Sequence, residues 1–179
     1  MVLLGCKPAG RHTEQHDIYF GIANEMKELI PAFKKFWPEA KGKIHVDGWR
    51  EVTQVDGQSV QIIERSQKSK TATHQLFFIN LGGYKKEEFE EFHYKLIVAS
   101  PDKGAAIKLA KQTAFYKHTH FDGAASHVDD KYGVDVDDIY DINEILSIET
   151  KEKFAIELST ATTVAIDQLH LGYFKLDSL

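Results

Sequence analysis

Leu4-Gly5 followed by Glu14-Gln15-His16 is the stretch that decides the fold, because it occurs twice in this chain. The second copy reads Leu81-Gly82 followed by Glu91-Phe92-His93, and each matching residue lies 77 positions further on (81 − 4, 91 − 14, 93 − 16). Self-similarity at a fixed distance marks a repeated structural unit. These residues therefore predict that one unit is present in two diverged copies.

A second pair of matching segments supports the repeat. His45-Val46-Asp47 recurs as His127-Val128-Asp129, and this distance is 82 positions (127 − 45). The segments follow the same order in both halves of the chain. We assign the five additional residues (82 − 77) to the loop between a helix and a strand, because loops tolerate insertions.

Each half is predicted to contain two strands, a helix and two further strands. Ile18, Phe20 and Ile22 alternate along the strand expected at residues 16–23. Apolar residues at helical spacing follow up to Trp37, and Pro31 either kinks that helix or marks a later start. Asp56-Gly57 predicts a hairpin turn. In the second half, Ser100-Pro101-Asp102 favours a helix that runs to about residue 118.

The predicted fold class is α+β. We expect two tandem ββαββ units that form one body, with a mainly antiparallel sheet and two main helices, since one such unit cannot cover much core alone. The expected organisation is a first repeat unit at 1–65, a polar linker at 66–73, a second repeat unit at 74–146 and a C-terminal extension of strands or tail at 147–179.

One feature of the repeat does not align. When His16 is matched with His93, the apolar faces of the two strands fall out of phase, because Ile18 matches Tyr94 at a distance of 76 and not 77 (94 − 18). A shift of one residue turns a strand's side chains to the opposite face. We therefore expect a bulge near the histidine in one copy, so that His16 and His93 are not structural equivalents.

Composition and charge exclude several classes of protein. The 179 residues are 42% apolar and 27% charged, which suffices for a core without a metal or a disulfide. Cys6 is the one cysteine, so no intrachain disulfide forms, and a cytoplasmic protein is expected. No apolar stretch approaches the roughly 20 residues of a membrane span. The net charge of −5 argues against general attraction to nucleic acid. A homo-oligomer formed through paired strand edges is compatible with the sequence.

The motifs of both halves resemble a known bacterial family. In the first half they are Glu14-x-His16-Asp17, His45-x-Asp47-x-Trp49-Arg50-Glu51-Val52 and Val55-Asp56-Gly57. In the second half they are Phe78-Ile79-Asn80-Leu81-Gly82-Gly83-Tyr84, Glu91-x-His93 and His127-x-Asp129-Asp130. The sequence is similar to domain-of-unknown-function family 1543, whose members carry one or two copies of the domain. The resemblance covers roughly residues 1–146 and implies two tandem copies, but no activity, cofactor or catalytic residue.

The two His-x-Asp triplets are the first candidate site. Residues i and i+2 of a strand point to the same face, so His45 shares a face with Asp47 and His127 shares one with Asp129. If the two copies are related by a pseudo-twofold axis, two imidazoles and two carboxylates converge, a set that suits a divalent metal such as zinc, manganese or iron. The alternative is that each pair is a polar contact at the rim of the sheet, or that the aspartates begin turns.

The second candidate site comprises His16, Asp17 and His93. These residues follow glycine-containing loops, where a ligand can approach backbone N–H groups. No phosphate-binding loop is present, because Gly82-Gly83-Tyr84-Lys85 lacks the Gly-Lys-Ser/Thr ending before a helix. The alternative is a histidine at the start of a strand whose ring covers the core.

Two functions follow from these candidates. The first is a non-catalytic module that binds a ligand or a protein, because no catalytic motif is present and a duplicated unit tends to form a groove. The second is a metal-dependent hydrolase or other metalloenzyme that uses His45, Asp47, His127 and Asp129. The sequence does not decide between an enzyme and a binding protein. Nucleic-acid binding ranks third.

Overall fold

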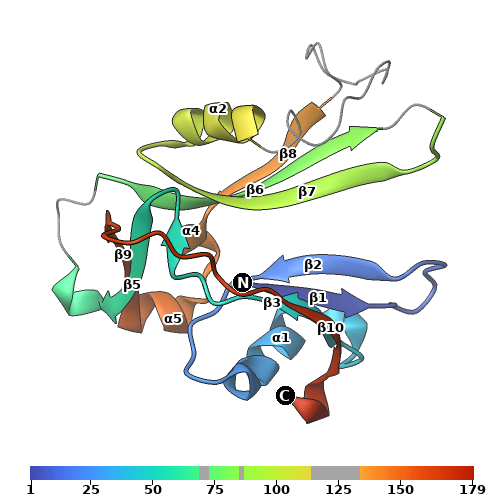
Figure 1. Ribbon diagram of the computed structural model, residues 1–179. Coiled ribbons are helices and arrows are strands. Elements are labelled where there is room, and N and C mark those ends of the chain that lie inside the picture. Colours follow the sequence, from blue (N-terminus) through green and yellow to red (C-terminus); the bar gives the residue numbers. More distant parts are fainter. Residues whose placement is uncertain (69–72, 85–86, 114–133) are drawn as a thin grey trace. The chain divides into compact units, whose positions relative to one another are not determined.

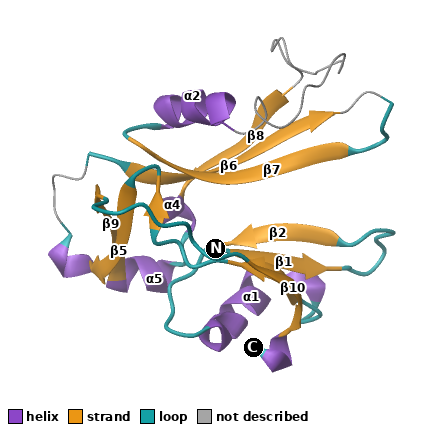
Figure 2. Ribbon diagram, viewed as in Figure 1, coloured by secondary structure: helices purple, strands orange, loops and turns teal. Residues whose placement is uncertain are grey.

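The chain folds into two compact units. The computed structural model describes residues 1–68, 73–84, 87–113 and 134–179. The first unit consists of Met1–Gln54, Leu146–Phe154 and Thr162–Leu179, and the second of Val55–Ile145 and Ala155–Ala161. Figure 1 names the elements and Figure 2 colours them by type; strands predominate, and helices are few and short. The predicted α+β class is confirmed.

The first unit is built on a sheet of four strands. These are β1 (Val2–Cys6), β2 (Gln15–Tyr19), β3 (His45–Trp49) and β10 (His170–Lys175), in the order β10-β3-β1-β2. All three neighbouring pairs are antiparallel. The C-terminal strand β10 therefore lies at the edge of a sheet whose other strands come from the first 49 residues.

Helix α1 (Ile30–Phe36) covers one face of this sheet (Figure 1). A 3-10 turn at Met26–Leu29 precedes it, and Pro31 lies in its first turn, where its missing N–H group has no helical acceptor to lose. Pro31 thus marks a later start and not a kink. Phe33 is fully buried, in one cluster with Val2, Leu4 and Val46 of the sheet.

The second unit contains a sheet of three strands and one longer helix. The strands are β6 (Gln75–Tyr84), β7 (Glu91–Ser100) and β8 (Val134–Asp141), in the order β7-β6-β8, and both pairs are antiparallel. Helix α2 (Lys103–Thr113) packs on one face through Ala106 and Ala110, which lie against Ile79. The Asp102 carboxylate accepts a hydrogen bond from the Ala105 N–H at 2.8 Å and so caps this helix.

No helix in the described part of the chain is long and apolar enough to cross a membrane.

The remaining elements include a second small sheet in the second unit. It contains β4 (Gln54–Val55), β5 (Gln58–Glu64) and β9 (Phe154–Thr160), in the order β4-β5-β9. Asp56 and Gly57 join β4 to β5 with φ values of 47° and 75°. Positive φ at both central residues is the conformation of a two-residue hairpin turn. The hairpin turn predicted at Asp56-Gly57 is therefore confirmed.

The C-terminal extension is not a tail. After the short helix α4 (Ile142–Ile145), it supplies α5 (Ile148–Lys153) and the strands β9 and β10. Strand β10 completes the sheet of the first unit, whereas β9 belongs to the small sheet of the second. The predicted strands are therefore present in this segment, whereas its helix α5 was not predicted.

The first two strands of both units pair in the same register. Gly5 lies opposite His16, and Gly82 lies opposite His93, 77 positions later in both cases (82 − 5, 93 − 16). The third strand of each unit also has its irregularity at the same place. The register shifts between Leu3 and Leu4 in the first unit and between Asn80 and Leu81 in the second.

The expected bulge near one of the two histidines was wrong. Pairing of β1 with β2, and of β6 with β7, is unbroken, so His16 and His93 occupy equivalent strand positions. The phase of apolar residues misled the prediction because the last part of each strand is buried on both faces. Ile18, Tyr19 and Phe20 are consecutive buried residues, as are those at 97–100. Alternation carries no information where both faces of a strand are buried.

Candidate functional site

Gly5 lies at the centre of a polar site on the sheet of the first unit. It is on the central strand β1, with His16 opposite on β2 and His45 opposite on β3. Residues that lie opposite each other in neighbouring strands point to the same face of a sheet. Leu4 and Val46, the neighbours of Gly5 and His45, pack in the core with α1. Successive side chains alternate between faces, so the site lies on the face away from α1.

Asp47 lies two residues after His45 on β3 and so points to the same face, and it is the extra residue of a bulge in that strand. The pairing passes from Leu4–Val46 to Leu3–Gly48, which leaves Asp47 without a partner on β1. A side chain at Gly5 would overlap with Asp47 Oδ2 and His45 Nε2. The absence of a Cβ atom at Gly5 is therefore what lets these two side chains meet above β1.

Four side chains are linked by close contacts above Gly5. His45 Nε2 lies 2.8 Å from Glu14 Oε1 and 3.2 Å from Asp47 Oδ1. The other carboxylate oxygen, Asp47 Oδ2, lies 3.2 Å from His16 Nε2. We call Glu14, His16, His45 and Asp47 the Gly5 cluster. Its contacts form a chain in which Asp47 joins two imidazoles and His45 joins two carboxylates.

Two buried side-chain atoms in the inner part of the Gly5 cluster lack a hydrogen bond among the described residues. The side chains of His45 and Asp47 are 9% and 22% exposed, whereas those of Glu14 and His16 are 43% and 42% exposed. Despite the short distances, His45 Nε2 and Asp47 Oδ2 have no partner with hydrogen-bond geometry among the described residues. Leaving a buried polar group without a hydrogen bond costs about 1–3 kcal/mol, and native structures contain few such groups.

Tyr173 of β10 forms one side of the site. Its ring lies on the His45 ring, with centroids 4.3 Å apart and planes inclined by 33°, and the residue is 65% exposed. The pairing of β10 with β3 is irregular between Leu171 and Phe174, so two residues of β10, Gly172 and Tyr173, lie opposite the single residue Asp47. Bulges of this kind redirect side chains and are frequent next to functional sites.

A stacked pair of rings also joins β10 to β3. Trp49 and His170 lie opposite each other, with centroids 3.8 Å apart and planes inclined by 7°. Trp49 also packs against the core of the first unit. Ring contacts with His45 and Trp49 of β3 therefore fix the position of β10, including Tyr173.

Cys6 does not provide a nucleophile near the cluster. Its side chain is fully buried. Burial raises the pKa of the Cys6 thiol, the charge of Glu14 raises it further, and Lys43 lowers it in part. Because only the thiolate reacts, a thiol with a raised pKa is inert at neutral pH.

The structure brings together half of the predicted metal site. His45 and Asp47 are in contact, whereas His127 and Asp129 lie outside the described residues. The register also changes the alignment of the third strands. Val46 lies opposite Leu4 and Val136 opposite Leu81, a distance of 90 and not 82 (136 − 46). By strand register, position 135, and not 127, corresponds to position 45.

The described residues contain no group of three or more His, Cys, Asp or Glu side chains arranged to hold a metal ion. The contacts of the Gly5 cluster run from one side chain to the next, from Glu14 to His45, Asp47 and His16. Such a chain differs from a ligand shell, in which all donor atoms face one point.

The structure does not bring together the three residues of the second candidate site, His16, Asp17 and His93. His16 belongs to the Gly5 cluster, but Asp17 pairs with Leu4 and so points to the opposite face, where its Oδ1 atom accepts a hydrogen bond from the Ile18 N–H at 2.7 Å. His93 is an exposed residue of the second unit, opposite Gly82. The strand period of two already places neighbouring residues such as His16 and Asp17 on opposite faces.

Sequence reasoning missed three participants of the site. Glu14 was noted in the repeat but not as a site residue, although Glu14-x-His16 has the spacing that places both side chains on one face. Gly5 was noted only as part of the repeated Leu4-Gly5 motif. Tyr173 gave no signal, because its contact with His45 joins residues 128 positions apart (173 − 45).

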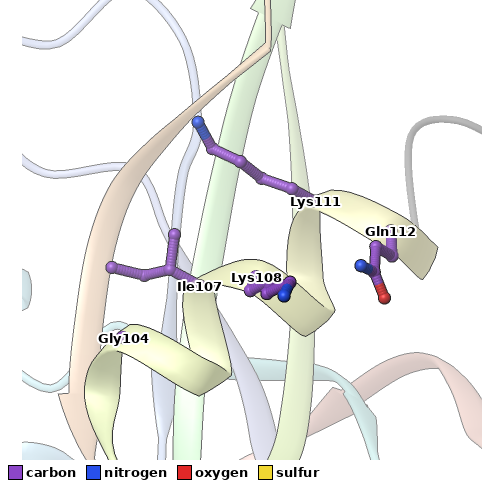
Figure 3. A pocket seen from close by; sticks show the side chains of 5 residues that line it. All are labelled: Gly104, Ile107, Lys108, Lys111 and Gln112. Atoms are coloured by element: carbon purple, nitrogen blue, oxygen red, sulfur yellow. The ribbon is translucent and has the colours of Figure 1, made fainter.

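A separate hollow of about 580 Å³ follows helix α2 of the second unit (Figure 3). Gly104, Ile107, Lys108, Lys111 and Gln112 line it at helical spacing. It contains no carboxylate, imidazole or thiol among these residues, and two lysines on one helix face are typical of a solvated surface. The Gly5 cluster is the stronger candidate.

Comparisons with known proteins agree with the fold. A protein Il1583 from Idiomarina loihiensis, known from its crystal structure, has a similar fold with a TM-score of 0.63 at 20% identity, over 98% of this chain and 94% of that chain. No curated protein matches the sequence. Residues 11–62 match the model of the Domain of Unknown Function (DUF1543) family, and this segment includes all four residues of the Gly5 cluster.

Proposed function

We propose that this protein is a ligand-binding module and that the Gly5 cluster is its binding site. One observation carries the proposal. His45 Nε2 and Asp47 Oδ2 are buried without a hydrogen bond in the described structure, next to two side chains that are partly exposed. A ligand with suitable polar groups would provide the missing hydrogen bonds and remove this energetic cost.

The irregular backbone around the Gly5 cluster also supports a binding site there. The extra residue Asp47 on β3 and the irregular pair Gly172–Tyr173 on β10 lie opposite each other. Gly5 leaves the space that both polar side chains fill. Regular strands would be simpler to form, so irregular pairing around one polar cluster is the pattern expected of a binding site.

We further propose that the two units are diverged copies of one ancestral domain, as in two-copy members of the matching family. The equal register of the first two strands and the equal position of the irregularity on the third support this. The copies differ at the position of His45, where the second unit has Asp135 opposite Gly82. The first unit therefore carries the cluster with two imidazoles. A cytoplasmic location accords with Cys6, a buried free thiol.

A thermal-shift screen tests the binding function. The full chain would be heated with zinc or manganese ions, organic cations, carboxylates and phosphates, in the wild type and in the variants Asp47→Asn and His93→Gln. His93→Gln is the matched control, because it changes the equivalent strand position in the other unit. We expect at least one class to raise the melting temperature of the wild type and the control but not of Asp47→Asn.

If no ligand class raises the melting temperature of the wild type at millimolar concentration, the proposal is overturned. A metalloenzyme is a separate outcome of the same screen. It would require near-stoichiometric metal in protein purified without a His-tag or chelator, measured by elemental analysis, together with loss of that metal in a His45→Ala variant. That result would replace the binding module with a metal-dependent reaction at His45 and Asp47.

A further inference from the structure

We infer that the ligand of the Gly5 cluster is an organic cation with N–H donors, an ammonium or guanidinium compound, held between the two carboxylates and the ring of Tyr173. The inference rests on the proposed binding function and specifies its ligand.

Charge is the first reason. Glu14 and Asp47 bring two carboxylates to one site, and both contact His45 Nε2. The four side chains of the cluster include no lysine or arginine. The two carboxylates bring negative charge to one place, and a bound cation would reduce their mutual repulsion. Opposite charges at these distances attract strongly where water is partly excluded.

Hydrogen-bonding capacity is the second reason. The His45 side chain is more than nine-tenths buried, and its Nε2 atom faces Glu14 Oε1 at 2.8 Å without hydrogen-bond geometry. If the Nδ1 atom carries the proton, Nε2 and the carboxylate oxygen present lone pairs to each other. That contact is favourable only with a donor or a cation beside it. Ammonium and guanidinium groups supply several N–H donors at once, which suits one imidazole nitrogen and two carboxylates.

The aromatic ring is the third reason, and it favours an organic cation over a metal ion. One side of Tyr173 lies on His45, yet the residue remains 65% exposed, so part of its ring is available to a ligand. Aromatic faces attract ammonium and guanidinium groups but are not ligands for metal ions. The described residues also offer no metal-binding group of three or more side chains.

Two variants of one residue test the inference by isothermal titration calorimetry. Methylguanidinium and ethylammonium are the probes, with zinc as a separate ligand, and the proteins are full-length wild type, Tyr173→Phe and Tyr173→Leu. We expect the organic cations to bind the wild type and Tyr173→Phe with similar affinity. Loss of the aromatic ring in Tyr173→Leu should weaken them about threefold to tenfold, the size of a cation–π contact at a partly exposed site.

The outcomes separate the two proposals. Zinc, carboxylate or phosphate binding that Asp47→Asn abolishes, without binding of either organic cation, would overturn the inference and leave the binding module intact. Organic-cation binding that is equal in Tyr173→Leu and the wild type would overturn the role of Tyr173. Absence of binding by all of these ligands would overturn both the inference and the proposed function. Circular dichroism of each variant shows whether it is folded before titration.

Discussion

At the scale of single residues, Gly5 determines whether the cluster can form. Gly5 lies on β1, opposite His16 on β2 and opposite His45 on β3. The side chains of His45 and Asp47 occupy the space above it. A residue with a Cβ atom would force those side chains apart. The site therefore depends on the absence of a Cβ atom at Gly5. The identities of the four polar residues alone do not reveal this requirement.

Gly5→Ala is expected to lower the free energy of unfolding by about 1–3 kcal/mol, the usual cost of overfilling a packed site. The reason is overlap with His45 Nε2 and Asp47 Oδ2. The same change should cost less than half as much in a His45→Ala/Asp47→Ala background, because residues in contact do not contribute additively. Urea unfolding of the four proteins measures both costs. An equal cost in both backgrounds would show that the backbone, and not the two side chains, requires glycine.

Glu149 provides a test of electrostatics in the first unit. Its carboxylate accepts a hydrogen bond from Lys35 Nζ at 2.9 Å, and this bond, with smaller contributions from its own backbone and from Ser147, lowers its pKa from 4.5 to about 2. A carboxyl group with a lowered pKa in the folded state stabilises the fold above its unfolded pKa. That contribution is lost as the pH falls from about 4.5 towards 2.

Lys35→Ala is therefore expected to be less stable than the wild type at pH 7, by an amount that shrinks as the pH falls through this range. Urea unfolding at several pH values measures the difference. Lys34→Ala is the control, because Lys34 is an exposed neighbour on the same helix, and its effect should not vary with pH in the same way. A constant difference between Lys35→Ala and the wild type would refute the coupling.

At the scale of elements, strand β10 shows that the C-terminal segment is part of the first unit. Phe174 lies opposite Val46 and packs against the core of that unit, whereas Leu171 on the same strand is 73% exposed. The two residues differ in environment although both are large and apolar. Their contrast allows the contribution of β10 to the core to be measured.

Phe174→Ala is expected to lower the free energy of unfolding by about 2–4 kcal/mol, somewhat less than for a fully buried phenylalanine. Leu171→Ala should change it by less than about 1 kcal/mol, because most of that side chain is in contact with water. Thermal and urea unfolding followed by near-ultraviolet circular dichroism give both values. Similar small effects for the two variants would mean that β10 adds little to the stability of the first unit.

At the scale of the whole molecule, the two units are not two consecutive segments of the chain. The last part of the sequence returns to the first unit through β10 and to the second through β9. The polypeptide therefore passes between the units several times. The similarity in fold to the protein Il1583 covers 98% of this chain, so it extends through both units.

Much of this organisation was determined by the sequence alone. The recurrence of Leu4-Gly5 and His16 after 77 residues predicted a repeated unit. The bulge expected near one histidine was wrong, because the first two strands of both units pair without a break. Local chemistry predicted the turn at Asp56-Gly57 and allowed the later start of the helix at Pro31. These features depend on residues close in sequence or on backbone preferences, which the chain expresses without its tertiary contacts.

Only the tertiary structure decided which polar residues form a site. His45 meets Glu14 across 31 positions (45 − 14), and Tyr173 meets His45 across 128 (173 − 45). The extra residue at Asp47 and the true alignment of β8 were hidden, because an irregular pairing leaves no trace in hydrophobic alternation. The sequence could predict that His45 and Asp47 share a face. Their partners follow from strand order, and strand order is set by packing between distant segments.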